Sequence, residues 1–182
     1  SYIVGITSGN LEGTSAGDED AFVAKFNENG IHQWTNQFGT DKSDQLRGIA
    51  LSSNQQKIYV SGSTKGNIDG ASSNDADRDY FFSSLDISGN QIEITQNGTT
   101  AAEYSPALAI SNSGEVYVLG STFGTLVSGQ NVGYYDLFIH KFQEEIDDFD
   151  NDGIADDIDT DDDGDGVNDS DEALIGTDPL DT

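Results

Sequence analysis

The stretch Tyr2-Ile3-Val4-Gly5-Ile6-Thr7 decides the fold, because the sequence repeats it twice. It recurs as Tyr59-Val60-Ser61-Gly62-Ser63-Thr64 and as Tyr117-Val118-Leu119-Gly120-Ser121-Thr122, at offsets of 57 and 58 residues. A second motif, Asp20-Ala21-Phe22-Val23-Ala24-Lys25-Phe26, has counterparts at residues 79–85 and 136–142. Two motifs that keep the same period indicate an internal structural repeat.

Each full copy of the repeat predicts four short strands. We expect strands at 2–7, 20–26, 32–39 and 46–52 in the first copy, at 58–64, 79–86, 91–96 and 106–112 in the second, and at 116–122 and 136–142 in the third. The segments Asn29-Gly30 and Ser88-Gly89-Asn90 favour tight hairpins between the second and third strands, because these residues tolerate positive φ. The strand at 20–26 is apolar on both faces, which is typical of a sheet stacked between neighbouring sheets.

Four-stranded units at this period are typical of β-propeller blades. The first copy adds Gly9-Asn10-Leu11-Glu12-Gly13 and then Asn29-Gly30 followed by Trp34, and with them it resembles the bacterial β-propeller repeat known as SBBP. The second copy keeps Gly66-Asn67-Ile68-Asp69-Gly70, and the third has Gly124-Thr125-Leu126. This resemblance covers residues 1–142 and implies a secreted or surface-exposed bacterial propeller.

Ten strands make about two and a half blades, whereas a closed propeller needs at least about four. The first and last sheets would then expose apolar faces and open edges. Either the remaining blades belong to a longer or separate chain, or several copies complete each other as an oligomer or filament; the sequence leaves both open. The chain opens in a strand without an initiator Met and stops where another aspartate loop would begin, so we expect a processed product or a fragment.

The tail is strongly acidic: residues 143–182 hold 18 of the 34 Asp and Glu residues and no Lys or Arg. Two loops, 13 residues apart, follow the spacing of EF-hand-type calcium loops, with ligands at positions 1, 3, 5, 7, 9 and 12 and Gly at 6. The expected ligands of the first loop are Asp148, Asp150, Asp152, the Ile154 carbonyl, Asp156 and Asp159. Those of the second are Asp161, Asp163, Asp165, the Val167 carbonyl, Asp169 and Glu172. We therefore expect two or more Ca²⁺ ions, whose binding orders a segment of mutually repelling carboxylates.

The tail departs from a true EF-hand, since no long amphipathic helix precedes Asp148 and the apolar residue sits at position 7 of each loop. With Glu172-Ala173-Leu174-Ile175-Gly176-Thr177-Asp178-Pro179 after the loops, residues 147–182 resemble the thrombospondin type 3 repeats of bacterial surface proteins. That resemblance implies calcium wrapped by chain with little hydrophobic core, as a stalk or spacer. Ser170 is expected to cap a short helical turn, 171–175, that ends at Gly176.

Plainer interpretations compete with these. An acidic tail is often solvated and disordered, but Gly at position 6 of two loops in register favours calcium binding. The loops between the first and second strands are acidic too, and for them a solvated loop is favoured over a metal site per blade. These acidic positions are Glu12, Asp18, Asp20, Asp69, Asp75, Asp77 and Asp79. His32 and His140 have no partner motif, and Trp34 is expected in the core of its blade.

Composition excludes several classes of function. A net charge of -27 without a basic stripe excludes nucleic-acid binding, and no apolar run is long enough for a membrane span. The absence of Cys excludes disulfides and thiolate metal sites. No nucleophile elbow, zinc motif or phosphate loop is present, so we expect no enzymatic activity in this chain.

The sequence thus predicts an all-β fold: residues 1–145 form about two and a half four-stranded propeller blades, and residues 146–182 an extended calcium-binding tail with little regular structure. The leading function is a calcium-binding structural or adhesive module of a secreted or cell-surface bacterial protein. Its partners would be other copies, remaining propeller blades, or surface glycans or proteins. The alternative is a fragment of a carbohydrate-binding or enzymatic propeller whose active face lies on missing blades. A calcium buffer or sensor is less favoured, since no helix pair could open on binding.

Overall fold

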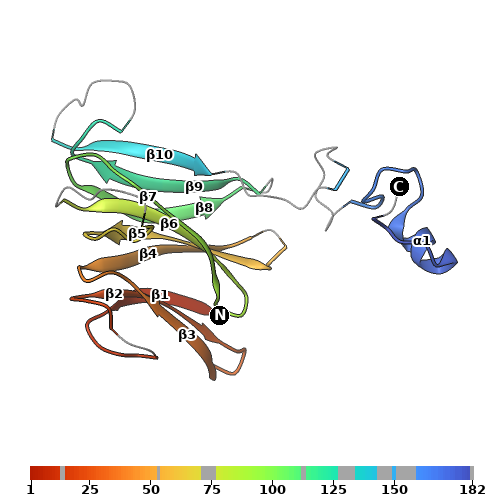
Figure 1. Cartoon of the computed structure of the whole chain (residues 1–182), viewed down its shortest axis with the longest axis horizontal. Coiled ribbons are helices and arrows are strands. Elements are labelled where there is room, and N and C mark those ends of the chain that lie inside the picture. Colours follow the sequence, from red (N-terminus) through yellow and green to blue (C-terminus); the bar gives the residue numbers. More distant parts are fainter. Residues whose placement is uncertain are drawn as a thin grey trace. The chain divides into compact units, whose positions relative to one another are not determined.

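The computed structural model describes residues 1–12, 15–52, 54–70, 77–111, 114–126, 134–142, 149–150 and 159–180. The chain divides into two compact units, Ser1–Phe142 and Gln143–Thr182, which are described separately below. The first unit consists of β-strands, and the described part of the second contains one short helix (Figure 1). The expected all-β class is confirmed.

Among the described residues, ten strands form within three residues of the expected bounds. They are β1 (Tyr2–Thr7), β2 (Asp20–Phe26), β3 (His32–Phe38), β4 (Asp44–Leu51), β5 (Lys57–Thr64), β6 (Asp79–Asp86), β7 (Gln91–Asn97), β8 (Glu103–Ile110), β9 (Val116–Thr122) and β10 (Asp136–Phe142). The two hairpin turns contain the expected positive-φ glycines, Gly30 at 74° and Gly89 at 92°. Asn27 and Asp86 hold these turns by accepting backbone N–H groups with their side-chain oxygens.

The strands form three antiparallel sheets, with orders β1-β2-β3, β4-β5-β6-β7 and β8-β9-β10. The grouping of strands expected from the sequence is wrong at two places: β4 and β8 belong to the sheet of the following copy, not of their own. The reason is local. Tight turns join β4 to β5 and β8 to β9, where the Ser52 and Ser111 N–H groups donate to the carbonyls of Lys57 and Glu115 at 2.9 Å. A hairpin partner must lie in the same sheet, so the sheet boundary falls before each fourth strand.

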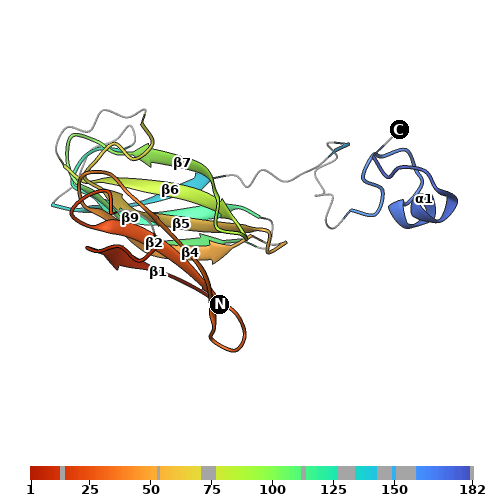
Figure 2. The ribbon, with the colours of Figure 1, turned by 60° about the horizontal axis from the view of Figure 1, so that its bottom comes forward.

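The three sheets lie as successive layers (Figure 1). After rotation, β4 and β7 are seen at opposite edges of the middle sheet (Figure 2). One core cluster lies between the first and middle sheets and includes Val23, Val60 and Phe81, all 0% exposed. A second lies between the middle and last sheets and includes Phe82 and Val118. The central strands of the middle sheet, β5 and β6, are therefore buried on both faces, whereas the edge strand β7 is largely exposed.

In the second unit, helix α1 (Asp169–Ile175) is the regular element of the described residues. Gly176 ends it in the left-handed conformation, with φ of 85°, and donates its N–H to the Glu172 carbonyl at 2.8 Å. The sequence predicted this end correctly. The expected Ser170 cap is wrong: the helix begins two residues earlier than expected, and Asn168 is its N-cap without a side-chain hydrogen bond. Among the described residues, the helices are too short and too polar to cross a membrane.

Candidate metal centre

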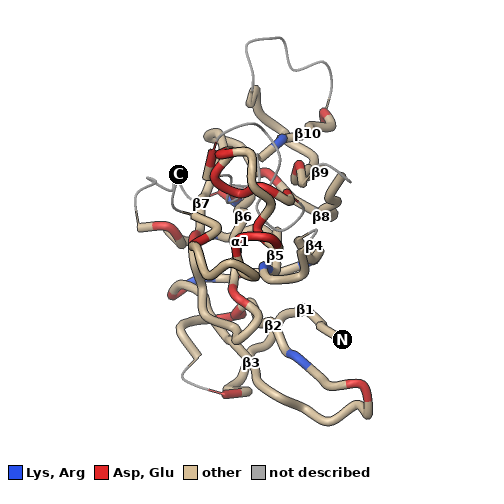
Figure 3. Tube along the Cα trace, turned by 90° about the vertical axis from the view of Figure 1, so that its right-hand side faces the viewer, with Lys and Arg blue, Asp and Glu red and all other residues tan. Residues whose placement is uncertain are grey.

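The second aspartate loop brings its first three expected ligands together. Oxygens of Asp161, Asp163 and Asp165, one from each carboxylate, lie within 4.8 Å of one another. The acidic positions of this unit are drawn red in Figure 3, and residues 143–182 contain no Lys or Arg to neutralise them. Three carboxylates at this separation repel one another unless a cation or protons intervene.

Backbone geometry curls the loop around this cluster. Gly164 and Gly166 have φ of 69° and 94°, which a side-chain-bearing residue adopts only with strain. The Gly166 N–H donates to Asp161 Oδ2 at 3.0 Å, and the Val167 N–H donates to Asp165 Oδ1 at 2.8 Å. These bonds hold one oxygen of Asp161 and one oxygen of Asp165.

Glu172, the residue at position 12, comes from α1 and is only 3% exposed. Burial raises the pKa of its carboxyl above the ordinary value, and repulsion from Asp163, Asp165 and Asp169 raises it further. Helix α1 begins within the loop, at Asp169, and carries Glu172, whose carboxyl is near enough to Asp163 and Asp165 to feel their charge.

Several oxygens of this cluster are buried without a hydrogen-bond partner. They are Asp161 Oδ1, Asp163 Oδ2 and Glu172 Oε2. Asp163 as a whole is only 5% exposed. Buried acceptors are nearly always satisfied in folded proteins, so a group of unsatisfied carboxylate oxygens in one loop requires an explanation. A bound cation satisfies them, because hard cations such as Ca²⁺ and Mg²⁺ take carboxylate oxygens as ligands.

Asp150, an expected ligand of the first loop, lies beside the second loop. A Cβ at Gly164 would lie 2.6 Å from Asp150 Oδ2, so a side chain at this position would displace the carboxylate. The spacing rule singled out the glycine at position 6 and missed this one at position 4. Its signal in the sequence is the second glycine in Asp163-Gly164-Asp165-Gly166.

The remaining expected ligands are placed differently or not described. Asp159 accepts the N–H groups of Thr160 and Asp161 at 2.6 and 3.1 Å, so it caps the start of the second loop. Asp169 Oδ1 accepts the Asp162 N–H at 2.9 Å and closes the loop. Asp148, Asp152, Ile154 and Asp156 lie outside the described residues.

The sheet unit contains a second polar feature, which the sequence interpretation missed. Asp44, at the start of β4, is fully buried, and its Oδ2 accepts the Thr40 N–H at 2.5 Å and the Thr40 hydroxyl at 2.9 Å. The Thr64 hydroxyl donates to its Oδ1. Burial raises the pKa of Asp44, and the nearby charge of Asp20 raises it further.

The same arrangement recurs one repeat later. Glu103, at the start of β8, is fully buried and accepts the Thr99 N–H and the hydroxyls of Thr99 and Thr122 at 2.7–2.8 Å. Gln37 and Gln96 donate to Asp20 and Asp79 at 2.7 Å in the respective copies. The signal was available in the sequence, since Thr40 and Thr99, four residues before each carboxylate, share the repeat period.

These networks correct the expectation that the acidic strand-connecting loops are solvated throughout. Asp20 is 0% exposed and Asp79 is 7% exposed, whereas Glu12 is exposed. Asp75 lies outside the described residues. These carboxyls accept hydrogen bonds from neutral hydroxyl and amide donors, as in a structural polar network, although Asp20 Oδ1 is buried without a partner.

Trp34, His140 and His32 each contact neighbouring residues of the sheet unit. Trp34 packs against the first core cluster and donates its indole N–H to the Ile87 carbonyl at 3.3 Å, as expected for a core residue. His140 forms a 2.5 Å hydrogen bond with the Tyr80 hydroxyl, and burial lowers its pKa. His32 lies 4.0 Å from Glu12 at the surface.

Comparison with known proteins adds no family assignment. The chain matches no protein-family model and none of the curated proteins. The case for function therefore rests on the geometry of the second aspartate loop.

Proposed function

We propose that this chain is a calcium-binding structural module, in which Ca²⁺ orders the second unit. The observation that carries the proposal is the set of buried carboxylate oxygens without a hydrogen-bond partner on Asp161, Asp163 and Glu172. Asp165 completes the group that would hold the ion. The ion would supply the positive charge that residues 143–182 lack.

Calcium is favoured over magnesium by the loop itself. Ca²⁺ accepts six to eight oxygens in flexible geometry, whereas Mg²⁺ demands a near-ideal octahedron and retains its waters. A curled loop with carboxylates at alternate positions and a Glu at position 12 supports the larger ion. The first loop would bind a further Ca²⁺ if its aspartates adopt the same arrangement.

The sheet unit supports a structural role for the whole chain. Three layered sheets of three, four and three strands are compatible with consecutive blades of a β-propeller of the SBBP type. The tail would then be a thrombospondin type 3-like spacer. Calcium at the concentration such sites need is found outside cells, so we propose a secreted or cell-surface bacterial protein whose partners include other copies, further blades, or surface glycans or proteins.

Calorimetric titration with CaCl₂ tests the calcium site. The chain should bind Ca²⁺ with a sub-millimolar to millimolar dissociation constant, and MgCl₂ should bind more weakly. Asp163→Asn should weaken binding by at least about tenfold, or ~1.4 kcal/mol. Asp171→Asn is the matched control, because Asp171 is exposed on α1. This substitution removes the same charge but leaves the aspartate cluster unchanged. Equal weakening by both variants would mean that general negative charge, and not this loop, attracts the ion.

A further inference from the structure

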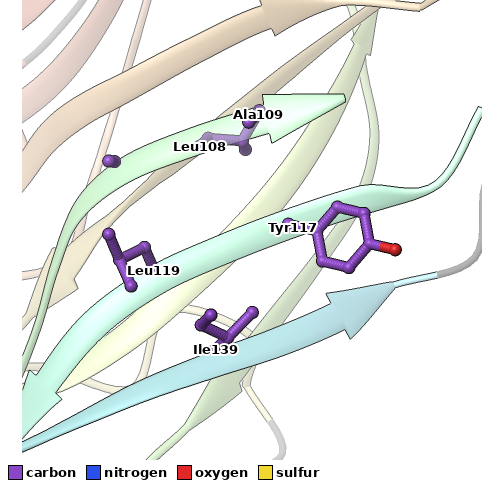
Figure 4. Close-up of a pocket in the computed structure, with 6 residues that line it drawn as sticks. Leu108, Ala109, Tyr117, Leu119 and Ile139 are labelled. Carbon is purple, nitrogen blue, oxygen red and sulfur yellow. The ribbon is translucent and has the colours of Figure 1, made fainter. Parts of the chain in front are cut away.

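An apolar groove of about 200 Å³ lies on the outer face of the last sheet. It is lined by Ala107, Leu108, Ala109, Tyr117, Leu119 and Ile139. Figure 4 shows Leu119 and Ile139 on neighbouring strands, with the Tyr117 ring further along β9. Ile139 is 69% exposed and the adjacent Leu137 is 81% exposed. Exposed aliphatic side chains gathered on one sheet face mark an interaction surface.

The strand register identifies which residues of the middle sheet occupy the positions equivalent to this face of the last sheet. Across the last sheet, Ala107 pairs with Leu119, which pairs with Ile139. Across the middle sheet, Gly48 pairs with Ser61, which pairs with Phe82. The two rows occupy equivalent positions of the repeat.

In the middle sheet, this row is covered by the next sheet. Phe82 is 3% exposed and stacks on Phe142 of β10 with ring centroids 4.4 Å apart. Gly48 lies against Leu108 of β8, where an added Cβ would come within 3.0 Å of the Leu108 Cβ. The groove is therefore the repeat-equivalent of a surface that receives a further sheet.

The opposite end of the stack presents the matching surface. In each sheet a Phe ring lies over a Gly of the neighbouring strand: Phe22 over Gly5, Phe81 over Gly62, and Phe138 over Gly120.

Phe81 and Phe138 of these pairs pack against the preceding sheet, in the first and second core clusters. The equivalent β1–β2 face has no preceding sheet among the described residues, and there Ile3 is 47% exposed.

We propose that the groove on β8–β10 binds the β1–β2 face of a second copy of this chain. This inference rests on the structural role proposed above and is independent of calcium. The two surfaces are different, so the contact is head-to-tail, and it generates a ring or a filament according to the rotation between copies.

Sedimentation velocity over a range of concentrations, in the presence of a calcium chelator, tests this contact. The mass of the wild-type chain should rise with concentration. Ile139→Glu in the groove and Ile3→Glu on the β1–β2 face should each give monomers. An equimolar mixture of the two variants should give dimers and no larger species, since one intact groove and one intact face remain in the mixture.

Leu174→Glu is the control, because Leu174 is 83% exposed on α1 in the other unit. This variant should associate like the wild type. Leu137→Glu provides a second groove-side variant, and circular dichroism should confirm that each variant is folded.

A wild-type chain that stays monomeric, or a variant mixture that stays monomeric, would overturn the proposal. Association of Ile3→Glu alone would also overturn it, because only a groove-to-groove contact would survive. Ca²⁺ titration of Ile139→Glu should remain as in the wild type, so a failed association leaves the calcium proposal standing.

Discussion

At the scale of single residues, Asp44 and the loop carboxyls Asp163 and Glu172 are all buried, but they differ in their hydrogen bonds. Asp44 is surrounded by three donor groups, from Thr40 and Thr64. Glu172 and Asp163 each keep one buried oxygen without a donor. The first arrangement satisfies a carboxyl within the protein, and the second leaves room for a ligand that the protein must acquire from solution.

Gly164 should matter more to calcium binding than Gly166. Both have positive φ, so Ala at either position strains the backbone by about 1–2 kcal/mol. At Gly164 the added Cβ would also displace Asp150, whereas at Gly166 it meets no atom within 4 Å. Calorimetry of Gly164→Ala and Gly166→Ala should show the larger loss of Ca²⁺ affinity for Gly164→Ala; equal losses would remove Asp150 from the account.

Asp44 should make stability depend on pH in a defined direction. Its folded-state pKa lies above the ordinary value of 3.8, chiefly because of burial. The folded state therefore holds this proton more tightly than the unfolded state does. The resulting contribution to stability is fully present below pH 3.8 and is lost as pH rises through the folded-state pKa. Chemical unfolding from acid to neutral pH should show wild type losing free energy of unfolding relative to Asp44→Asn. A constant difference between the two proteins across that range would contradict the assignment.

At the scale of elements, the repeat motifs and the patterning between them located the ten strands of the described residues, but not the boundary between sheets. Alternating and doubly apolar patterns report where a strand lies and which faces are buried. They do not report which neighbour a strand pairs with, because that depends on turn closures such as Ser52 to Lys57. The buried Thr and Asp networks were missed for a related reason. An aspartate that begins a strand looks like a loop residue until its partners from other strands are known.

The middle sheet should dominate the stability of the first unit. Phe81 on β6 is 0% exposed and belongs to the first core cluster, so Phe81→Ala should cost about 3–5 kcal/mol of unfolding free energy. Ile92→Ala on β7 is the control, since Ile92 is 56% exposed and should change stability by no more than about 0.5 kcal/mol. Urea unfolding followed by fluorescence of the single Trp34 measures both. A small loss for Phe81→Ala would mean that the sheets do not unfold as one body.

At the scale of the whole molecule, the two units are stabilised by different means. Ser1–Phe142 contains two hydrophobic clusters between layered sheets. The described part of Gln143–Thr182 holds an acidic loop and one short helix, with Leu174 and Ile175 more than 70% exposed. Loop spacing in the sequence predicted the grouping of Asp161, Asp163 and Asp165, because calcium ligands follow a local rule. It could not predict the approach of Asp150 to Gly164, which depends on how the chain folds back.

Hydrogen exchange of the intact chain, with Ca²⁺ or with a chelator at matched ionic strength, tests most directly whether calcium orders the second unit. Ca²⁺ should slow exchange across residues 161–176, including the Gly166 and Val167 amides that donate to Asp161 and Asp165. Peptides from residues 1–142 should exchange at the same rate in both conditions. Unchanged exchange of residues 161–176 on saturation with Ca²⁺ would contradict the account, because the carboxylate cluster would then not depend on the ion for its order.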